Sequence, residues 1–146
     1  MRRILIVDDD PDILESLRAL FGKDVLSASV RTARSGHEAL PYVASEEFAL
    51  ILTDYKMPGM DGLEFLRHAR EAQANVPAVL MTAFPDLEIA IRAINEAHVQ
   101  SFLQKPLDPQ QVVRVVEGIL GAWEKKAEEV RGITRSVDAL RRQKVV

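Results

Sequence analysis

The sequence predicts an α/β fold, a doubly wound parallel sheet in which five strands alternate with five helices. Short apolar runs alternate with segments of helical periodicity over most of the chain. The first run, Ile4–Val7, is continuously apolar, as in parallel strands that are covered on both faces. Acidic residues follow it directly, at the edge where such sheets bind ligands. Together these observations predict a binding site at the carboxyl edge of the sheet.

The predicted elements follow one another in a regular order. The strands are Ile4–Val7, Val30–Ala33, Phe48–Thr53, Ala78–Thr82 and Ser101–Leu103. The helices run from Pro11 to about Phe21, from Ser35 onward, around Leu63–Ala69, from Asp86 to about Ala97, and from Asp108 onward. Right-handed crossovers between parallel strands then place helices on both faces of the sheet.

Several helix starts have recognisable capping residues. Asp10 precedes Pro11, which predicts an N-cap followed by proline at the first helical position, and Asp108 with Pro109 repeats the pattern. Ser35 and Glu38 have the spacing of a capping box. Asp10 is therefore assigned a structural role.

Composition limits the organisation of the chain. With 146 residues, of which 47% are hydrophobic and 28% charged, it can bury one sizeable core and add an appendage. It has no cysteine, so disulfides and thiolate metal sites are excluded. No signal peptide or membrane-spanning apolar stretch is present, because Asp8 interrupts the first apolar run. We expect a cytoplasmic protein that does not contact the membrane.

The last predicted helix continues beyond the end of an ordinary domain of this type. Its apolar residues follow the 4,3 spacing of a coiled-coil seam, broken by one lysine: Val112, Val116, Ile119, Trp123, Lys126, Val130, Ile133, Val137 and Leu140. A helix packed back on the domain would show a similar pattern, but five helices already cover both sheet faces. We therefore expect a protruding helix that forms a homodimer.

Charge is distributed unevenly between the two parts of the chain. Residues 1–123 carry 12 basic and 18 acidic side chains, whereas residues 124–146 carry 7 basic and 4 acidic side chains. The acidic part would repel phosphate backbones, and the basic part has no interleaved aromatic residues. We predict no binding of nucleic acid by this chain.

Polar residues follow four of the predicted strands. Asp8 and Asp9 come after the first, Asp54 after the third, Thr82 ends the fourth and Lys105 follows the fifth. Carboxylates on a short turn suit Mg²⁺, which keeps coordinated waters for a phosphate-bearing partner. Acids, a hydroxyl and an amine at one edge are suited to phosphoryl transfer onto a carboxylate.

The chain resembles the receiver domain of two-component response regulators over roughly residues 1–122, which leaves residues 123–146 as a helical extension or linker. The resemblance is carried by Ile4–Asp9, Thr53–Gly62, Met81–Ala83 and Phe102–Pro106, in the order and spacing of that family. Each motif alone is weakly specific, but the set is highly specific. It implies a flavodoxin-like sheet with strand order 2-1-3-4-5.

The resemblance also implies roles for individual residues. Asp54 would be the phosphoacceptor. Asp9 would bind Mg²⁺ directly, Asp8 through water, and Lys56 through its carbonyl. Thr82 and Lys105 would contact the phosphoryl group, and the Lys105–Pro106 peptide would be cis.

One aromatic residue also stands at a position with a role in that family. Phe102 stands at the position of an aromatic switch, although a core aromatic on a short strand fits it equally well. As a receiver, the chain would be a signalling domain that catalyses only its own phosphorylation and dephosphorylation. Its partner would be a sensor histidine kinase or a phosphotransfer protein.

Two other functions remain open from the sequence. An enzyme of the haloacid dehalogenase class also uses an aspartyl-phosphate, and Asp8 and Asp10 supply its D-x-D turn. However, Asp12 stands where that class has Thr or Val, no cap domain is present, and Asp54 would have no role. A receiver-shaped binding module that is never phosphorylated is the other alternative.

The sequence does not show how the signal leaves the domain. It contains no helix-turn-helix, ATPase loop or cyclic-dinucleotide motif. Since Val145 and Val146 follow a helical segment with no stop signal, we expect the chain to be part of a longer regulator with a C-terminal effector domain.

Overall fold

Strands and helices alternate throughout the residues that the computed structural model describes, which are 2–22, 28–83 and 86–143. The strands are β1 (Arg2–Val7), β2 (Ala28–Ala33), β3 (Leu50–Asp54), β4 (Ala78–Thr82) and β5 (Ser101–Gln104). The helices are α1 (Pro11–Phe21), α2 (Gly36–Ser45), α3 (Gly62–Ala72), α4 (Leu87–Ala97) and α5 (Pro109–Gln143). The strands are parallel and lie in the order β2-β1-β3-β4-β5, which confirms the predicted flavodoxin-like α/β fold.

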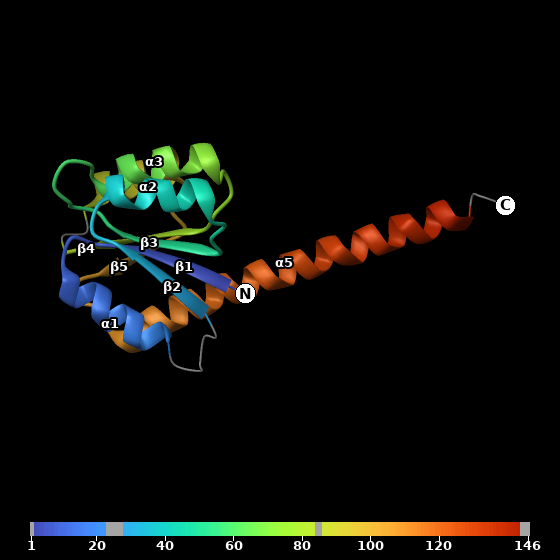
Figure 1. Cartoon of the computed structure of the whole chain (residues 1–146), viewed down its shortest axis with the longest axis horizontal. Coiled ribbons are helices and arrows are strands. Elements are labelled where there is room, and N and C mark those ends of the chain that lie inside the picture. The colour runs from blue at the N-terminus through green and yellow to red at the C-terminus, as the bar shows by residue number, and fades with distance from the viewer. Residues whose placement is uncertain (1, 23–27, 84–85, 144–146) are drawn as a thin grey trace.

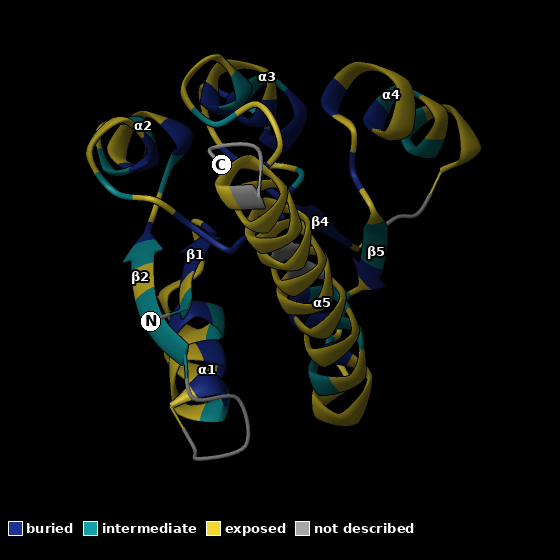
Figure 2. Ribbon diagram, turned by 90° about the vertical axis from the view of Figure 1, so that its right-hand side faces the viewer, coloured by how far each residue is buried: buried dark blue, intermediate teal, exposed yellow. Residues whose placement is uncertain are grey.

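Two hydrophobic cores lie on the two faces of the sheet. Helices α2, α3 and α4 cover one face, and α1 and the first turns of α5 cover the other (Figures 1 and 2). Successive residues of β1 alternate between these cores, with Leu5 and Val7 in the first and Ile4 and Ile6 in the second. This double burial explains why the strand is continuously apolar rather than alternating.

The bounds of β1, β2, β3 and β5 differ from the predictions by one or two residues, whereas β4 has the predicted bounds. Both β1 and β2 begin two residues early, since Arg2 pairs with Ala28 in the ladder although neither belongs to an apolar run. Strand β3 begins at Leu50 rather than at Phe48 and continues through Asp54. Phe48 is buried, but its backbone N–H donates to the side chain of Gln73 instead of joining the sheet.

The helix starts follow the predicted capping chemistry. The Asp10 carboxylate accepts a hydrogen bond from the Asp12 N–H at 2.9 Å, with Pro11 at the start of α1. The Ser35 hydroxyl accepts from the Glu38 N–H at 3.1 Å, as in a capping box. The Glu38 carboxylate accepts from Arg34 N–H rather than from Ser35, so only half of the box is formed.

Helix α5 is continuous over 35 residues and extends well beyond the sheet (Figure 1). Val112, Val116 and Leu120 are buried in the core, whereas the described side chains after residue 120 are exposed. Glu124 forms an ion pair with Arg2 at 3.2 Å, close to where the helix leaves the domain. The helix therefore protrudes as predicted, although the division into a domain of residues 1–122 and an extension remains a proposal.

None of the helices in the described part of the chain is both long and apolar enough to cross a membrane.

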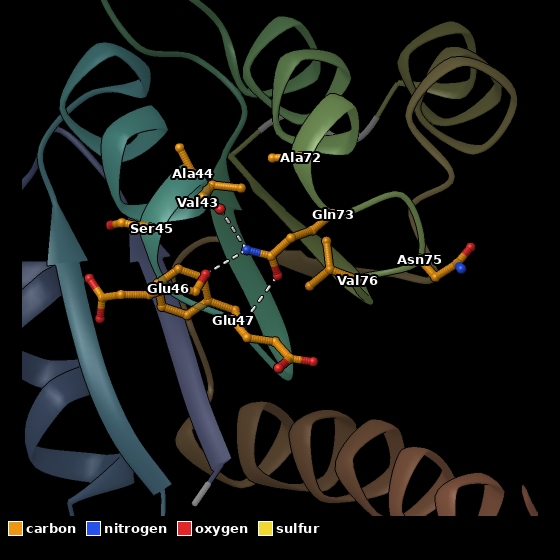
Figure 3. A pocket seen from close by; sticks show the side chains of 10 residues that line it. Val43, Ala44, Ser45, Glu46, Glu47, Ala72, Gln73, Asn75 and Val76 are labelled. Carbon is orange, nitrogen blue, oxygen red and sulfur yellow. Dashed lines mark hydrogen bonds between the residues drawn. The ribbon is translucent and has the colours of Figure 1, made fainter.

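At the edge of the sheet opposite the carboxyl ends of the strands, the side-chain amide of Gln73 joins three segments. The Gln73 Nε2 donates to the carbonyls of Val43 and Glu46 at 2.8 and 2.6 Å, and its Oε1 accepts from Phe48 N–H at 3.0 Å (Figure 3). These bonds join the end of α3 to the end of α2 and to the segment that leads into β3. All three groups are backbone groups that helix or strand pairing leaves without a partner.

Replacement of this amide by an isosteric carboxylate should destabilise the fold. In a Gln73→Glu variant, an oxygen would replace the Nε2 donor and face two carbonyl oxygens, so we expect a loss of about 2–4 kcal/mol in the free energy of unfolding. Chemical denaturation measures the difference. Gln111→Glu makes the same change on an exposed face of α5 and should leave the stability within about 0.5 kcal/mol of wild type. Equal effects of the two variants would contradict this account of the corner.

Candidate functional site

The carboxyl ends of the strands bring the predicted acidic residues together. Asp8 and Asp9 follow β1, and Asp54 is the last residue of the adjacent β3. One carboxylate oxygen from each lies within 4.8 Å of the others. Asp8 is fully buried and Asp54 is 6% exposed, whereas Asp9 is exposed. The cluster therefore opens to solvent on the side of Asp9.

The amine of Lys105 lies between the two buried carboxylates. Its Nζ is 2.8 Å from Asp8 Oδ2 and 3.2 Å from Asp54 Oδ1. The backbone N–H of Asp10 donates to Asp8 Oδ1 at 2.9 Å, so both oxygens of Asp8 have partners. The sequence predicted that Lys105 would meet a phosphoryl group, but it did not predict this pairing with both acids.

Burial and mutual repulsion set the electrostatics of the cluster. Burial, and then the nearby charge of Asp8, raises the pKa of Asp54 to about 6, although Lys105 opposes the shift. Burial also raises the pKa of Asp8, more than its bond to Lys105 lowers it. Burial opposes the charge on Lys105, but its bond to Asp8 and the charges of both acids outweigh this and raise its pKa. One ammonium thus leaves the three acids short of positive charge.

The donor set fits a small divalent cation. Three carboxylates converge with hard oxygen atoms, and one of them faces solvent, which leaves room for the coordinated waters that Mg²⁺ retains. A divalent ion would also supply the positive charge that the cluster lacks. Lys56 lies on the exposed loop after β3. The backbone carbonyl of Lys56 remains a predicted ligand of Mg²⁺.

Glycine at position 62 allows the loop after β3 to close against the site. The Gly62 N–H donates to the Tyr55 carbonyl at 2.7 Å, and a Cβ at position 62 would overlap the carbonyl oxygen of Asp54. Asp61 caps α3 through the Glu64 N–H at 2.8 Å. The Asp61–Gly62 pair therefore starts α3 directly behind the backbone of Asp54. Sequence reasoning identified the turn but missed this contact, for which the only signal was a glycine at the start of a helix.

The remaining predicted residues lie close to the cluster or along β5. Thr82 ends β4, one residue after Met81, which pairs with Asp54 in the sheet, and it is 7% exposed. Phe102 is half-buried on β5 and packs against the core under α2, α3 and α4. The Lys105–Pro106 peptide is cis, as the resemblance implied.

Comparison with known proteins identifies the family. Residues 4–117 match the response regulator receiver domain. The chain belongs to this family, and its sheet order and acid cluster agree with the match.

Individual relatives agree with the family match. The chain is 34% identical over 128 residues to the response regulator protein PilR of Pseudomonas aeruginosa, covering 88% of this chain and 28% of PilR. It is 33% identical over 136 residues to the DNA-binding transcriptional regulator NtrC of Salmonella typhimurium, covering 90% of this chain and 28% of NtrC. The chain thus spans less than a third of the length of these two relatives.

The fold is also found among solved structures. A CheY-like response regulator receiver domain protein from Methanospirillum hungatei JF-1 superposes with a TM-score of 0.79 at 29% identity, covering 86% of this chain and 98% of that one.

The raised pKa of Asp54 predicts a specific dependence of stability on pH. The folded state binds a proton on Asp54 below about pH 6, whereas the unfolded chain does so only below about pH 4. The ionised Asp54 therefore lowers the free energy of unfolding by its full amount at pH 7, and this loss of stability shrinks as the pH drops from 6 to 4. An Asp54→Asn variant should be more stable than wild type at pH 7 without divalent ions, by a margin that shrinks towards pH 4. Denaturant unfolding at several pH values measures that margin, and growth of the margin on acidification would refute the account.

Substitution of Gly62 should disturb both the fold and the site. The added Cβ of Gly62→Ala would push against the Asp54 backbone, so we expect a loss of about 3 kcal/mol in the free energy of unfolding and weaker Mg²⁺ binding. Gly118→Ala adds the same methyl group to open space on α5 and should stabilise the chain by about 0.5–1 kcal/mol. Thermal unfolding and Mg²⁺ titration report the two effects. A stable Gly62→Ala variant with unchanged Mg²⁺ affinity would contradict the close contact.

Proposed function

We propose that the chain is a phosphoacceptor signalling domain in which Asp54 receives a phosphoryl group in a Mg²⁺-dependent reaction. The main support is the position of Asp54, which is buried beside Asp8 and close to Asp9. Its Oδ1 lies 3.2 Å from Lys105 Nζ. A nucleophilic carboxylate, an acidic metal site and an ammonium group then meet at one point. The donor would be a sensor histidine kinase or a phosphotransfer protein.

The proposed transfer is an in-line displacement at phosphorus. A carboxylate oxygen of Asp54 forms a bond to phosphorus as the bond to the imidazole nitrogen of a phosphohistidine breaks, and the leaving imidazole takes up a proton. Bound Mg²⁺ would supply positive charge to the phosphoryl oxygens. Asp8 and Asp9, with the Lys56 carbonyl, would hold the ion. Lys105 would exchange its contact with Asp54 for one with a phosphoryl oxygen, and Thr82 would donate a hydrogen bond to another.

We propose that the signal leaves through the face formed by α4, β5 and α5. A phosphoryl group adds about two negative charges and three acceptor oxygens. Movement of Thr82 towards the phosphoryl group would give Phe102 space to turn inward. The two packing states of Phe102 would then be in an equilibrium that phosphorylation shifts. Two observations support this route: Phe102 is half-buried, and Leu87 and Ile91 of α4 are exposed.

Two further parts of the proposal concern context. We place the protein in the cytoplasm, where its kinase partner would act, and attach an effector domain beyond α5, because the relatives are three to four times longer than the matched segment. We also propose that the protruding part of α5 forms a homodimer, because its apolar side chains Val130, Ile133, Val137 and Leu140 are 40–64% exposed. The dehalogenase-class alternative gives Asp54 no role, although Asp54 lies within the acid cluster, and the family match also favours a receiver. A binding module that is never phosphorylated is the alternative that the experiment must separate.

Phosphorylation should require both Asp54 and a divalent ion. Incubation with acetyl phosphate and Mg²⁺ should add one phosphoryl group, as measured by intact mass, and chelation or Asp54→Asn should abolish it because the nucleophile or its counterion is lost. Asp10→Asn is the matched control, since Asn retains the N-cap of α1 and should leave labelling unchanged. Labelling that persists in Asp54→Asn would refute the assignment, and no labelling of the wild type would favour the binding module.

A second variant distinguishes the role of Lys105 from that of Mg²⁺ in the same experiment. Lys105→Ala should retain Mg²⁺ binding, since it removes a positive charge that competes for Asp8 and Asp54, but should slow labelling by roughly tenfold or more. Loss of Mg²⁺ affinity in Lys105→Ala would show that the roles are divided incorrectly. The Mg²⁺ titration is read in the absence of phosphodonor, so the two effects remain distinct.

A further inference from the structure

One buried polar side chain beside the acid cluster has no part in the proposed transfer. In the described part of the chain, the buried residues with polar side chains are Asp8, Thr53, Asp54 and Thr82. Three of them belong to the site. The fourth, Thr53, is fully buried in β3 and directly precedes the proposed phosphoacceptor. Its hydroxyl therefore requires an explanation of its own.

The surroundings of Thr53 would suit an apolar side chain of the same shape. Its partners in the neighbouring strands are Val7 of β1 and Leu80 of β4, which both belong to the core under α2, α3 and α4. Valine has the branching of threonine without the hydroxyl, so burial alone would favour valine at this position. A buried hydroxyl is tolerated where it has a hydrogen-bond partner, and the identity of that partner indicates what the hydroxyl does.

The hydroxyl of Thr53 is bonded to the backbone of Asp54. Its Oγ1 donates to the Asp54 carbonyl oxygen at 3.0 Å, and the backbone of Gly62 lies close to the same oxygen. The N–H of Tyr55, at the other end of this peptide unit, donates to the Met81 carbonyl at 2.9 Å. Because a peptide unit is planar and rigid, bonds at its carbonyl and at its N–H together fix the plane that follows Asp54.

We propose that Thr53 is a positioning residue for phosphoryl transfer, which holds the peptide after Asp54 and thereby the direction of the nucleophilic carboxylate. A rotation of this peptide plane would change the backbone torsion ψ of Asp54. The carboxylate and the loop after β3 would then turn relative to each other. In-line attack depends on such geometry, since a shift of about 1 Å in a reacting group lowers a rate by roughly 100-fold. The inference rests on the phosphoacceptor function proposed above.

Two substitutions in the full chain separate the hydroxyl of Thr53 from its packing. Thr53→Val keeps the shape and removes the donor, so the maximal rate of labelling by acetyl phosphate at saturating Mg²⁺ should fall roughly fivefold, as for the loss of one neutral hydrogen bond. The half-saturating concentration of acetyl phosphate should change by less than about twofold, because Thr53 is buried away from the donor. Thr53→Ser keeps the donor but removes a buried methyl group. It should lower the melting temperature and still label within about twofold of the wild-type rate.

The control and the contrary outcomes are set by the same comparison. Thr134→Val removes a hydroxyl that also donates to a backbone carbonyl, that of Val130 at 3.0 Å on the exposed part of α5, and should leave the rate unchanged. If the wild type is labelled, an unchanged rate in Thr53→Val would overturn the role of Thr53. A Thr53→Ser variant as slow as Thr53→Val would also overturn it, because the rate would then follow packing. A wild type that takes no label would overturn the phosphoacceptor assignment itself.

Amide hydrogen exchange tests the held peptide without Mg²⁺ or phosphodonor. In Thr53→Val, the Tyr55 N–H should exchange roughly fivefold faster relative to the Ile51 N–H, because its peptide unit has lost one bond. Ile51 donates to the Pro77 carbonyl at 2.9 Å in the same strand, so the ratio corrects for a change in overall stability. In Thr53→Ser the ratio should stay within about twofold of wild type. An unchanged ratio in Thr53→Val would overturn the proposal even where labelling slows, because the slower rate would then have another cause.

Discussion

The burial of two mutually repelling carboxylates is the constraint around which the rest of the structure is arranged. Asp8 and Asp54 lie on adjacent strands and are almost fully removed from water, and Lys105 is the cation that reaches both. Without such a partner, buried acids of this kind take up protons. The sheet order makes β1 and β3 neighbours, and the parallel direction of all five strands brings the end of β5 to the same edge. One ammonium does not fully offset the burial and mutual repulsion of these acids, so the site is suited to accept more positive charge.

The sequence predicted what depends on local pattern and strand order. Continuous apolar runs ending in Asp8, Asp54 and Thr82 were enough to predict a parallel sheet with acids at its carboxyl edge, and the family motifs added the order of the strands. The ion pair between Lys105 and Asp8 joins residues 97 positions apart. Which oxygen such an amine approaches depends on the closure of the β5–α5 turn, and no sequence spacing encodes it.

The errors at strand ends have a common physical cause. Apolar runs report burial, whereas strand bounds are set by backbone pairing. Arg2 is paired although it is only partly buried, and Phe48 is buried although its N–H bonds to Gln73. The side-chain amide of Gln73 takes the place of a strand partner for Phe48. A single glutamine near the end of a helix has no sequence pattern that would predict this contact.

Helix α5 connects the two ends of the molecule mechanically. Lys105 lies four residues before the start of the helix, so a change in the partners of its amine acts through a short connection. The first turns of the helix are held in the core by Val112 and Val116. Thirty-five continuous residues form a rod of roughly 52 Å, along which a rotation at one end persists to the other. A small rotation driven from the acid cluster would therefore turn the exposed side chains of Val130, Ile133, Val137 and Leu140 relative to the domain. In the proposed homodimer, the continuity of the helix would let the site change how the two chains meet.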